Sequence, residues 1–143
     1  MKVPLLDVTR IPADLQARLE ARAIEVLRSG EYILGPAVSA FERDCERVLE
    51  VPHALGVSNG SDAILMLLMA LGIGPGDEVI VPSYTFFATA GAVSRLGGTP
   101  VFADSCADTL NLDPAQVSRL ITARTRAIIP VHLFGLAADL AGL

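Results

Sequence analysis

The fold is decided by residues 57–88, which have the sequence VSNGSDAILMLLMALGIGPGDEVIVPSYTFFA. Residues 58–62 predict a turn, and the apolar stretch from Ala63 to Leu71 predicts a helix that is buried nearly all round. A tight Gly-Pro-Gly-Asp turn follows at residues 74–77. A strand is predicted from Glu78 to Val81, because it contains a continuous apolar run that is typical of a parallel sheet. The stretch therefore predicts one helix, one turn and one buried strand in succession.

Helices and strands alternate on both sides of this stretch. Further helices are predicted over 12–29, from Pro36 onward, over 86–96 and 114–121, and from Gly135 and Asp139 onward; further strands are predicted over 53–57, 100–103 and 127–133. This alternation predicts an α/β fold with a mainly parallel sheet and flanking helices. The carboxyl ends of the strands should meet at one edge, where ligands usually bind. Cys45 lies at a helical spacing from apolar neighbours and is expected in the core.

Composition narrows the class of protein. The chain has 143 residues, about one domain, and a net charge of -5, which argues against a nucleic-acid partner. No signal peptide or run of about 18 apolar residues is present, so no membrane segment is predicted. Cys45 and Cys106 form no disulfide framework and are expected to be reduced thiols in a cytoplasmic protein. The last predicted helix has completed only about one turn at Leu143, so we expect a chain truncated at its C-terminus.

The turn around Gly60 is the strongest local signal for a ligand. The free N–H groups at the start of a helix attract an anion such as phosphate, and glycine lets the ligand approach the backbone closely. The alternative is a simple helix cap, in which Ser61 or Asp62 satisfies the first turn. The spacing is neither that of a Walker loop nor that of a dinucleotide fingerprint, which makes a generic nucleotide-binding module a weak alternative.

A second signal lies in residues 82–89, just past the carboxyl end of a predicted strand. Because successive helix residues point in different directions, one of Phe86 and Phe87 could join the core while the other faces a cleft; alternatively both are core residues. His132 ends an apolar strand and is either a hydrogen-bonded structural residue or a catalytic base. His53 has no partner in view, and no Cys or carboxylate stands at metal-ligand spacing, so no metal is predicted.

An acidic loop follows the strand predicted over residues 100–103. Asp104, Asp108 and Asp113 are expected to belong to a solvated connection rather than to a site.

Six motifs follow one another along the chain: SGEYILGP (29–36), VSNGSDA (57–63), GPGDEVIVPSYTF (74–86), TPVFAD (99–104), NLD (111–113) and PVHLFG (130–135). Together they resemble the N-terminal part of the DegT/DnrJ/EryC1/StrS family, the sugar aminotransferases of the fold-type I class that use pyridoxal 5'-phosphate (PLP). The resemblance implies a fold that is the N-terminal part of the large domain of such an enzyme. It implies an N-terminal arm and helix over residues 1–35 and a partial PLP-binding large domain over residues 36–143.

The resemblance also implies roles for particular residues. The turn with Gly60, Ser61 and Asp62 would bind the cofactor phosphate through its backbone amides, and Phe86 would stack on the pyridine ring. Phe87 then becomes the expected core residue. The Asp, Gln and Schiff-base Lys of the family lie downstream of the matched region, and Lys2 is the only lysine here. This chain therefore supplies no catalytic residue, and the isolated chain is expected to be inactive.

The activity implied is transfer of an amino group, with glutamate as the expected donor, to a nucleotide-linked keto-sugar in amino-sugar biosynthesis. Family members usually form homodimers, and a homodimer is expected of the complete protein. Two alternatives remain. One is a PLP-dependent sugar dehydratase of the same family, in which a His replaces the lysine. The other is a non-catalytic remnant that is a partner of a full-length paralogue.

Overall fold

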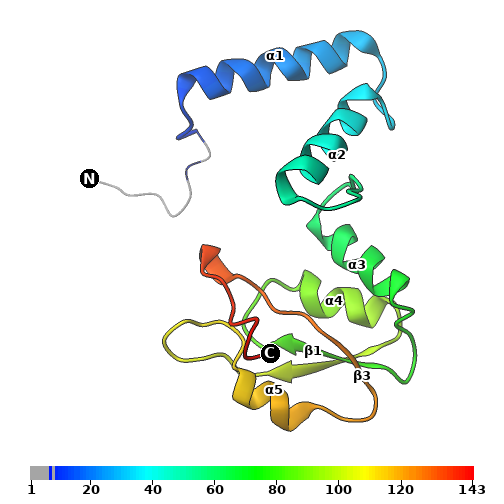
Figure 1. Ribbon diagram of the computed structural model, residues 1–143, viewed down its shortest axis with the longest axis vertical. Coiled ribbons are helices and arrows are strands. Elements are labelled where there is room, and N and C mark those ends of the chain that lie inside the picture. Colours follow the sequence, from blue (N-terminus) through cyan, green and yellow to red (C-terminus); the bar gives the residue numbers. More distant parts are fainter. Residues whose placement is uncertain (1–6, 8) are drawn as a thin grey trace. The chain divides into compact units, whose positions relative to one another are not determined.

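The computed structural model describes residue 7 and residues 9–143, and these form two compact units that are divided between Gly56 and Val57 (Figure 1). Within the described residues no helix combines the length and the apolar character needed to cross a bilayer. The boundary expected between residues 35 and 36 stays a prediction.

The first unit contains two helices, α1 (Ala13–Ser29) and α2 (Pro36–Leu49). Gly30 ends α1 with a φ of 72°, a left-handed conformation that glycine adopts without steric cost. Pro36 begins α2, where its missing N–H and fixed φ suit the first helical turn. Both helices occur where the sequence predicts them. Neither contains a buried residue, and Cys45 is only half-buried, so its predicted place in a core is wrong within this unit.

Residues 53–57 are not a strand, contrary to the sequence-based prediction. The N–H groups of Ala54 and Gly56 donate instead to the carboxylates of Glu46, at 3.2 Å, and Glu42, at 2.8 Å. Because two side chains of α2 occupy these donors, the segment follows α2 rather than pairing with a neighbouring strand.

The second unit is built on a parallel sheet of three strands: β1 (Glu78–Pro82), β2 (Thr99–Ala103) and β3 (Thr125–Ile128), in the order β2-β1-β3. At the centre of the register, Ile80 stands opposite Val101 of β2 and Ile128 of β3. Helix α3 (Gly60–Ala70) precedes β1, α4 (Ala88–Arg95) connects β1 to β2, and α5 (Pro114–Leu120) connects β2 to β3. This confirms the predicted α/β fold with a mainly parallel sheet.

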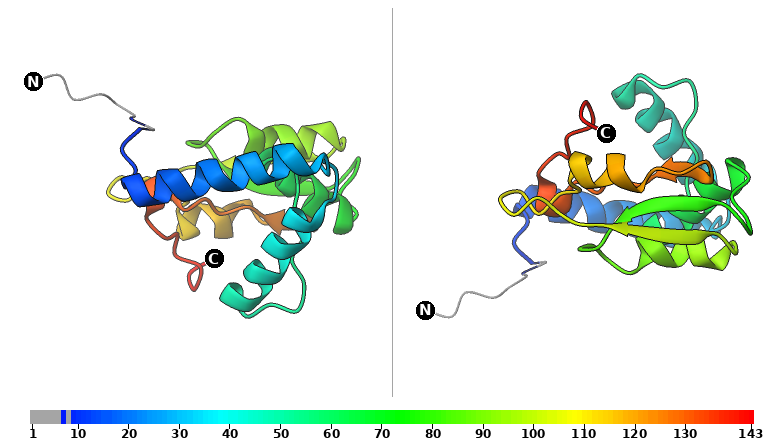
Figure 2. Two further views of the ribbon diagram at one scale, coloured as in Figure 1. Left: turned by 90° about the horizontal axis from the view of Figure 1, so that it is seen from above. Right: turned by 90° about the horizontal axis from the view of Figure 1, so that it is seen from below.

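Alternate residues of β1 face two different layers, as the period of a strand requires. Val79 and Val81 join a cluster with residues of α3 and α4, whereas Ile80 packs with Val117 of α5 on the other face. Figure 2 shows α4 and α5 on opposite faces of the sheet. All five residues of β1 are buried, which explains the apolar run that follows Glu78.

Helix α3 is less buried than its sequence predicts. Leu68 is its only buried residue, whereas the side chains of Leu67 and Met69 are mostly exposed. The reason is that α3 packs on one side only, mainly against α4. The prediction of burial nearly all round is therefore wrong for this unit.

Two boundaries near the end of the chain also differ from the predictions. Strand β3 ends at Ile128: the Ile129 N–H still donates to the Ile80 carbonyl at 2.9 Å, but Pro130 has no N–H to continue the ladder. A 3-10 turn, η1 (Leu133–Gly135), stands where a helix was predicted to begin, and residues 136–139 are not helical. The predicted final helix is therefore wrong within the described residues.

The buried side chain of Asn111 explains this ending. Its Nδ2 donates to the carbonyls of Leu136, at 3.0 Å, and Ala137, at 3.1 Å, and its Oδ1 accepts from the Leu133 N–H at 3.1 Å. These backbone groups are thus satisfied by a side chain rather than by helical hydrogen bonds.

Candidate functional site

The carboxyl ends of the parallel strands form one edge of the second unit. The Ser83 N–H donates to the Ala103 carbonyl at 2.9 Å, and its hydroxyl donates to Asp104 at 3.4 Å, which ties the end of β1 to the end of β2. Open α/β sheets bind ligands at this edge. Phe86 follows β1 here, and it lines one cavity together with Ser61 at the start of α3.

Asn59 caps the start of α3. Its backbone is extended, with φ -167° and ψ 170°, and its Oδ1 accepts from the Asp62 N–H at 2.9 Å. Its carbonyl accepts from the Ala63 N–H at 3.1 Å. The alternative in which Ser61 or Asp62 caps the helix is therefore wrong, although Asn directly before Gly is itself a signal for a cap.

This arrangement leaves two donors of the first turn available. The N–H groups of Gly60 and Ser61 have no acceptor among the residues that the structure describes. A Cβ built on Gly60 would meet no atom within 4 Å, so the space beside it is open. Free N–H groups at a helix start suit an anion such as phosphate. The Asp62 N–H is already engaged by Asn59, and its predicted contact with phosphate stays a prediction.

The Asp62 carboxylate turns toward the preceding loop and toward α4. Its Oδ2 accepts from the Ser58 hydroxyl and from Asn59 Nδ2, at 3.1 Å for the latter. Its Oδ1 lies 4.0 Å from an Arg95 guanidinium nitrogen. Sequence reasoning did not single out Asn59 or Arg95. Arg95 gives no local signal, because only the packing of α4 against α3 brings it to Asp62.

The cavity at this edge has a volume of about 490 Å³ and is mostly apolar. The side chains of Phe86 and Phe87 are 76% and 80% exposed, so the expectation that Phe87 lies in the core is wrong. The reason is that α4 begins only at Ala88; the Phe87 ring lies against Gly91, where an added Cβ would approach a ring carbon to 2.8 Å. Aromatic faces beside free N–H groups suit a planar, phosphorylated ring.

The other residues considered from the sequence have structural partners. His132 Nδ1 accepts from the Ala138 N–H at 2.9 Å, which supports the reading of His132 as a hydrogen-bonded structural residue. Asp113 caps α5 by accepting from the Ala115 N–H at 2.9 Å, and Asp108 accepts from the Thr109 N–H at 2.8 Å. Within residue 7 and residues 9–143, no three His, Cys, Asp or Glu side chains gather as metal ligands would.

Glu78 is the strongest charged feature of the sheet, but it stands at the opposite edge. It begins β1, and its buried carboxylate accepts from the Thr122 hydroxyl at 2.5 Å and from the Arg124 guanidinium. These contacts, Thr122 first, hold the pKa of Glu78 below its usual value. Glu78 therefore joins β1 to the segment before β3 and takes no part in the candidate site.

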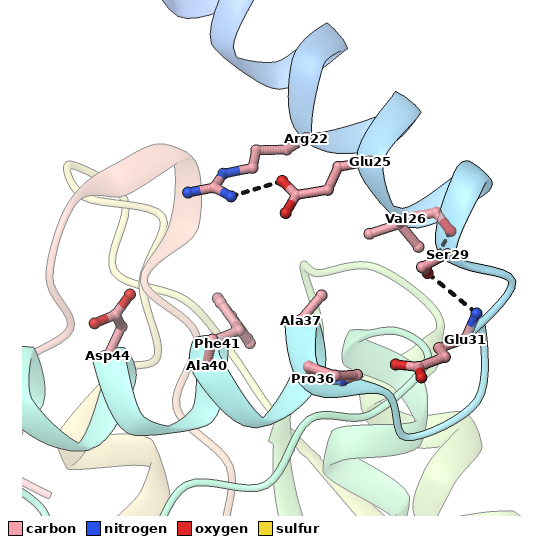
Figure 3. A pocket seen from close by; sticks show the side chains of 10 residues that line it. All are labelled: Arg22, Glu25, Val26, Ser29, Glu31, Pro36, Ala37, Ala40, Phe41 and Asp44. Carbon is pink, nitrogen blue, oxygen red and sulfur yellow. Dashed lines mark hydrogen bonds and ion pairs between the residues drawn. The ribbon is translucent and has the colours of Figure 1, made fainter.

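A larger cavity, of about 670 Å³, lies within the first unit between α1 and α2 (Figure 3). Arg22 and Glu25 point toward each other there and form an ion pair at 2.7 Å, while the Ser29 hydroxyl accepts from the Glu31 N–H at 3.1 Å. The polar groups that line this cavity are thus partly paired with one another, and none of the predicted site residues lines the cavity.

Comparisons with known proteins show the family of this chain. The sequence profile described as the DegT/DnrJ/EryC1/StrS aminotransferase family matches residues 13–143. A dTDP-3-amino-3,4,6-trideoxy-alpha-D-glucose transaminase of Streptomyces venezuelae is 47% identical over 142 residues, which cover 99% of this chain and 38% of that protein. The chain thus spans about two fifths of the length of the curated relatives that it matches.

Solved structures show the same likeness. S. venezuelae DesV, in complex with a ketimine intermediate, superposes with a TM-score of 0.90 at 47% identity, over 98% of this chain and 38% of that chain. The Bacillus subtilis protein ntda, with bound cofactor PMP, superposes with a TM-score of 0.90 at 39% identity, over 99% of this chain and 33% of that chain. PMP is pyridoxamine 5'-phosphate, a planar phosphorylated ring of the kind that the cavity suits.

Proposed function

We propose that this chain, which belongs to the DegT/DnrJ/EryC1/StrS aminotransferase family, forms the phosphate-binding and ring-facing part of a PLP-dependent aminotransferase that acts on a nucleotide-linked keto-sugar. One observation carries the proposal. Ser61 and Phe86, to which the family resemblance assigns contacts with the phosphate and the ring, line the same cavity, and the Ser61 N–H has no acceptor among the described residues.

The residues present fit the cofactor. The N–H groups of Gly60 and Ser61, which have no acceptor among the described residues, would hold the phosphate. The exposed ring of Phe86 would support one face of the pyridine and exclude water from it. When bound, PLP acts as an electron sink for the amino group in transfer.

None of the described residues is a lysine that could attach to the cofactor. Lys2 is the only lysine of the chain, and it lies outside the described residues. Covalent attachment of the cofactor needs a lysine amine beside its C4′ carbon. The residues described here therefore bind and orient the cofactor without moving a proton, and the 143-residue chain alone is expected to show no transaminase activity.

We further propose a sugar acceptor, an amino donor, an oligomeric state and a cellular location. A nucleotide-linked keto-sugar acceptor is supported by the name of the 47% identical relative, and glutamate is the expected amino donor. A homodimer is expected of the complete protein, and the exposed apolar side chains of Leu67 and Met69 on α3 are consistent with a further interface. A cytoplasmic location is consistent with Cys45 and Cys106, which are free thiols here.

The experiment that tests the proposal compares two probes that differ only in the phosphate. PMP and pyridoxamine both fluoresce and both lack the aldehyde that would react with Lys2, so their binding to the 143-residue chain can be followed by fluorescence anisotropy. We expect PMP to bind at least tenfold more tightly than pyridoxamine, because only PMP reaches the N–H groups of α3. Equal affinities for the two probes would contradict the proposed site.

A further inference from the structure

We propose that Arg95 is a positioning residue for the phosphate end of this site, acting through Asp62; this inference rests on the proposed function. Arg95 is the last residue of α4 and lines the same cavity as Ser61 and Phe86. It is the one charged side chain among the described residues that line this cavity.

An anion at the start of α3 would be attracted by some groups and repelled by another. The helix dipole and the free N–H groups favour a phosphate, but Asp62 places a carboxylate in the same first turn. Two negative groups that are close together disfavour each other's charged forms, so Asp62 would weaken the binding of a phosphate dianion.

The Asp62 side chain is not needed to cap the helix, because Asn59 Oδ1 already accepts the Asp62 N–H. Its Oδ2 is instead held by the Ser58 hydroxyl and the Asn59 amide, and Arg95 approaches its Oδ1 to 4.0 Å. Arg95 thus stands where its positive charge offsets the Asp62 carboxylate. The consequence is that the helix start remains attractive to a phosphate.

The expected effect is moderate and specific to charge. The side chains of Arg95 and Asp62 are 63% and 39% exposed, so their ion pair adds little to the stability of the fold. Removing the Arg95 charge should weaken PMP binding by up to about fivefold at low salt, since exposed charges contribute up to about 1 kcal/mol. The effect should shrink in high salt, because salt screens exposed charges.

The test measures PMP and pyridoxamine affinity for Arg95→Gln and for a matched control. Arg119→Gln makes the same change in net charge at the end of α5, which lies on the other face of the sheet and does not line the cavity. We expect Arg95→Gln to weaken PMP binding and leave pyridoxamine binding unchanged. We expect Arg119→Gln to change neither, and Arg95→Lys to retain at least half of the wild-type affinity for PMP.

A second comparison tests the role of Asp62. Because the conflict lies in its carboxylate, the double variant Asp62→Asn with Arg95→Gln should recover most of the lost PMP affinity. Urea unfolding of each variant shows whether the fold is kept.

Phosphate-dependent binding by the wild type, with no loss in Arg95→Gln, would overturn the role of Arg95 and leave the proposed function standing. Equal loss of PMP and pyridoxamine, or no recovery in the double variant, would also overturn it. A wild-type chain without phosphate preference would overturn the proposed function itself.

Discussion

Replacing Gly60 with proline removes one N–H of the proposed phosphate site while leaving the helix intact. Gly60 is the first residue of α3, a position that proline favours. The preceding residue, Asn59, already has the extended backbone that a following proline requires. The Gly60 N–H has no acceptor among the described residues, and a Cβ at Gly60 meets no atom within 4 Å. The substitution therefore breaks no hydrogen bond of the described fold.

The magnitude follows from the bond that is lost. A hydrogen bond to a charged group contributes about 1.5–3 kcal/mol, so Gly60→Pro should weaken PMP binding by about 10- to 100-fold. Stability toward urea should stay the same or rise by about 0.4–1 kcal/mol, because proline restricts the unfolded chain. Gly60→Ala is the matched control, since it adds a Cβ but keeps the N–H.

The assay is the anisotropy titration with PMP, run beside urea unfolding of each variant. We expect Gly60→Ala to bind PMP at least fivefold more tightly than Gly60→Pro. If the two folded variants bind PMP equally, the Gly60 N–H does not hold the phosphate and the reasoning is refuted.

Three other substitutions test the fold around the site. Asn111→Ala should destabilise the chain by about 2–4 kcal/mol in urea unfolding, because the buried amide makes three hydrogen bonds to backbone groups; a loss below about 1 kcal/mol would contradict this. Phe134 has a φ of 52° and an exposed side chain, so Phe134→Gly should raise stability by about 1 kcal/mol, and a decrease would argue against backbone strain there. Thr122 and Arg124 lower the pKa of Glu78, so its contribution to stability is present above the usual value of 4.5 and is lost as pH falls below it. Glu78→Gln should flatten this part of the pH profile, and an unchanged profile would refute the assignment.

The elements that sequence reasoning predicted correctly have local causes. The apolar run of β1 and the prolines that begin α2 and α5 act within their own segments, so no distant residue is needed to recognise them. The predictions that failed depend on distant partners. Residues 53–57 are not a strand because Glu42 and Glu46 take their N–H groups, and the ending after β3 follows from Asn111, more than twenty residues earlier.

Part of the candidate site could also be predicted, because that part depends on local sequence. The sequence around Gly60 shows a helix start with free donors, and the motif that contains Phe86 indicates an aromatic ring at a strand end. Only the fold places Ser61 and Phe86 on one cavity and brings Arg95 to Asp62. The cap by Asn59 and the exposure of Phe87 also required the structure, because they depend on where α3 and α4 begin.

The most direct test of the proposed site follows the backbone amides themselves. Proton–nitrogen NMR spectra of the 143-residue chain, recorded during titration with PMP, report each N–H separately. The account predicts that the largest shifts occur at Gly60 and Ser61, and that pyridoxamine without the phosphate does not produce them. Unchanged resonances at these two amides, or larger shifts in the cavity between α1 and α2, would contradict it.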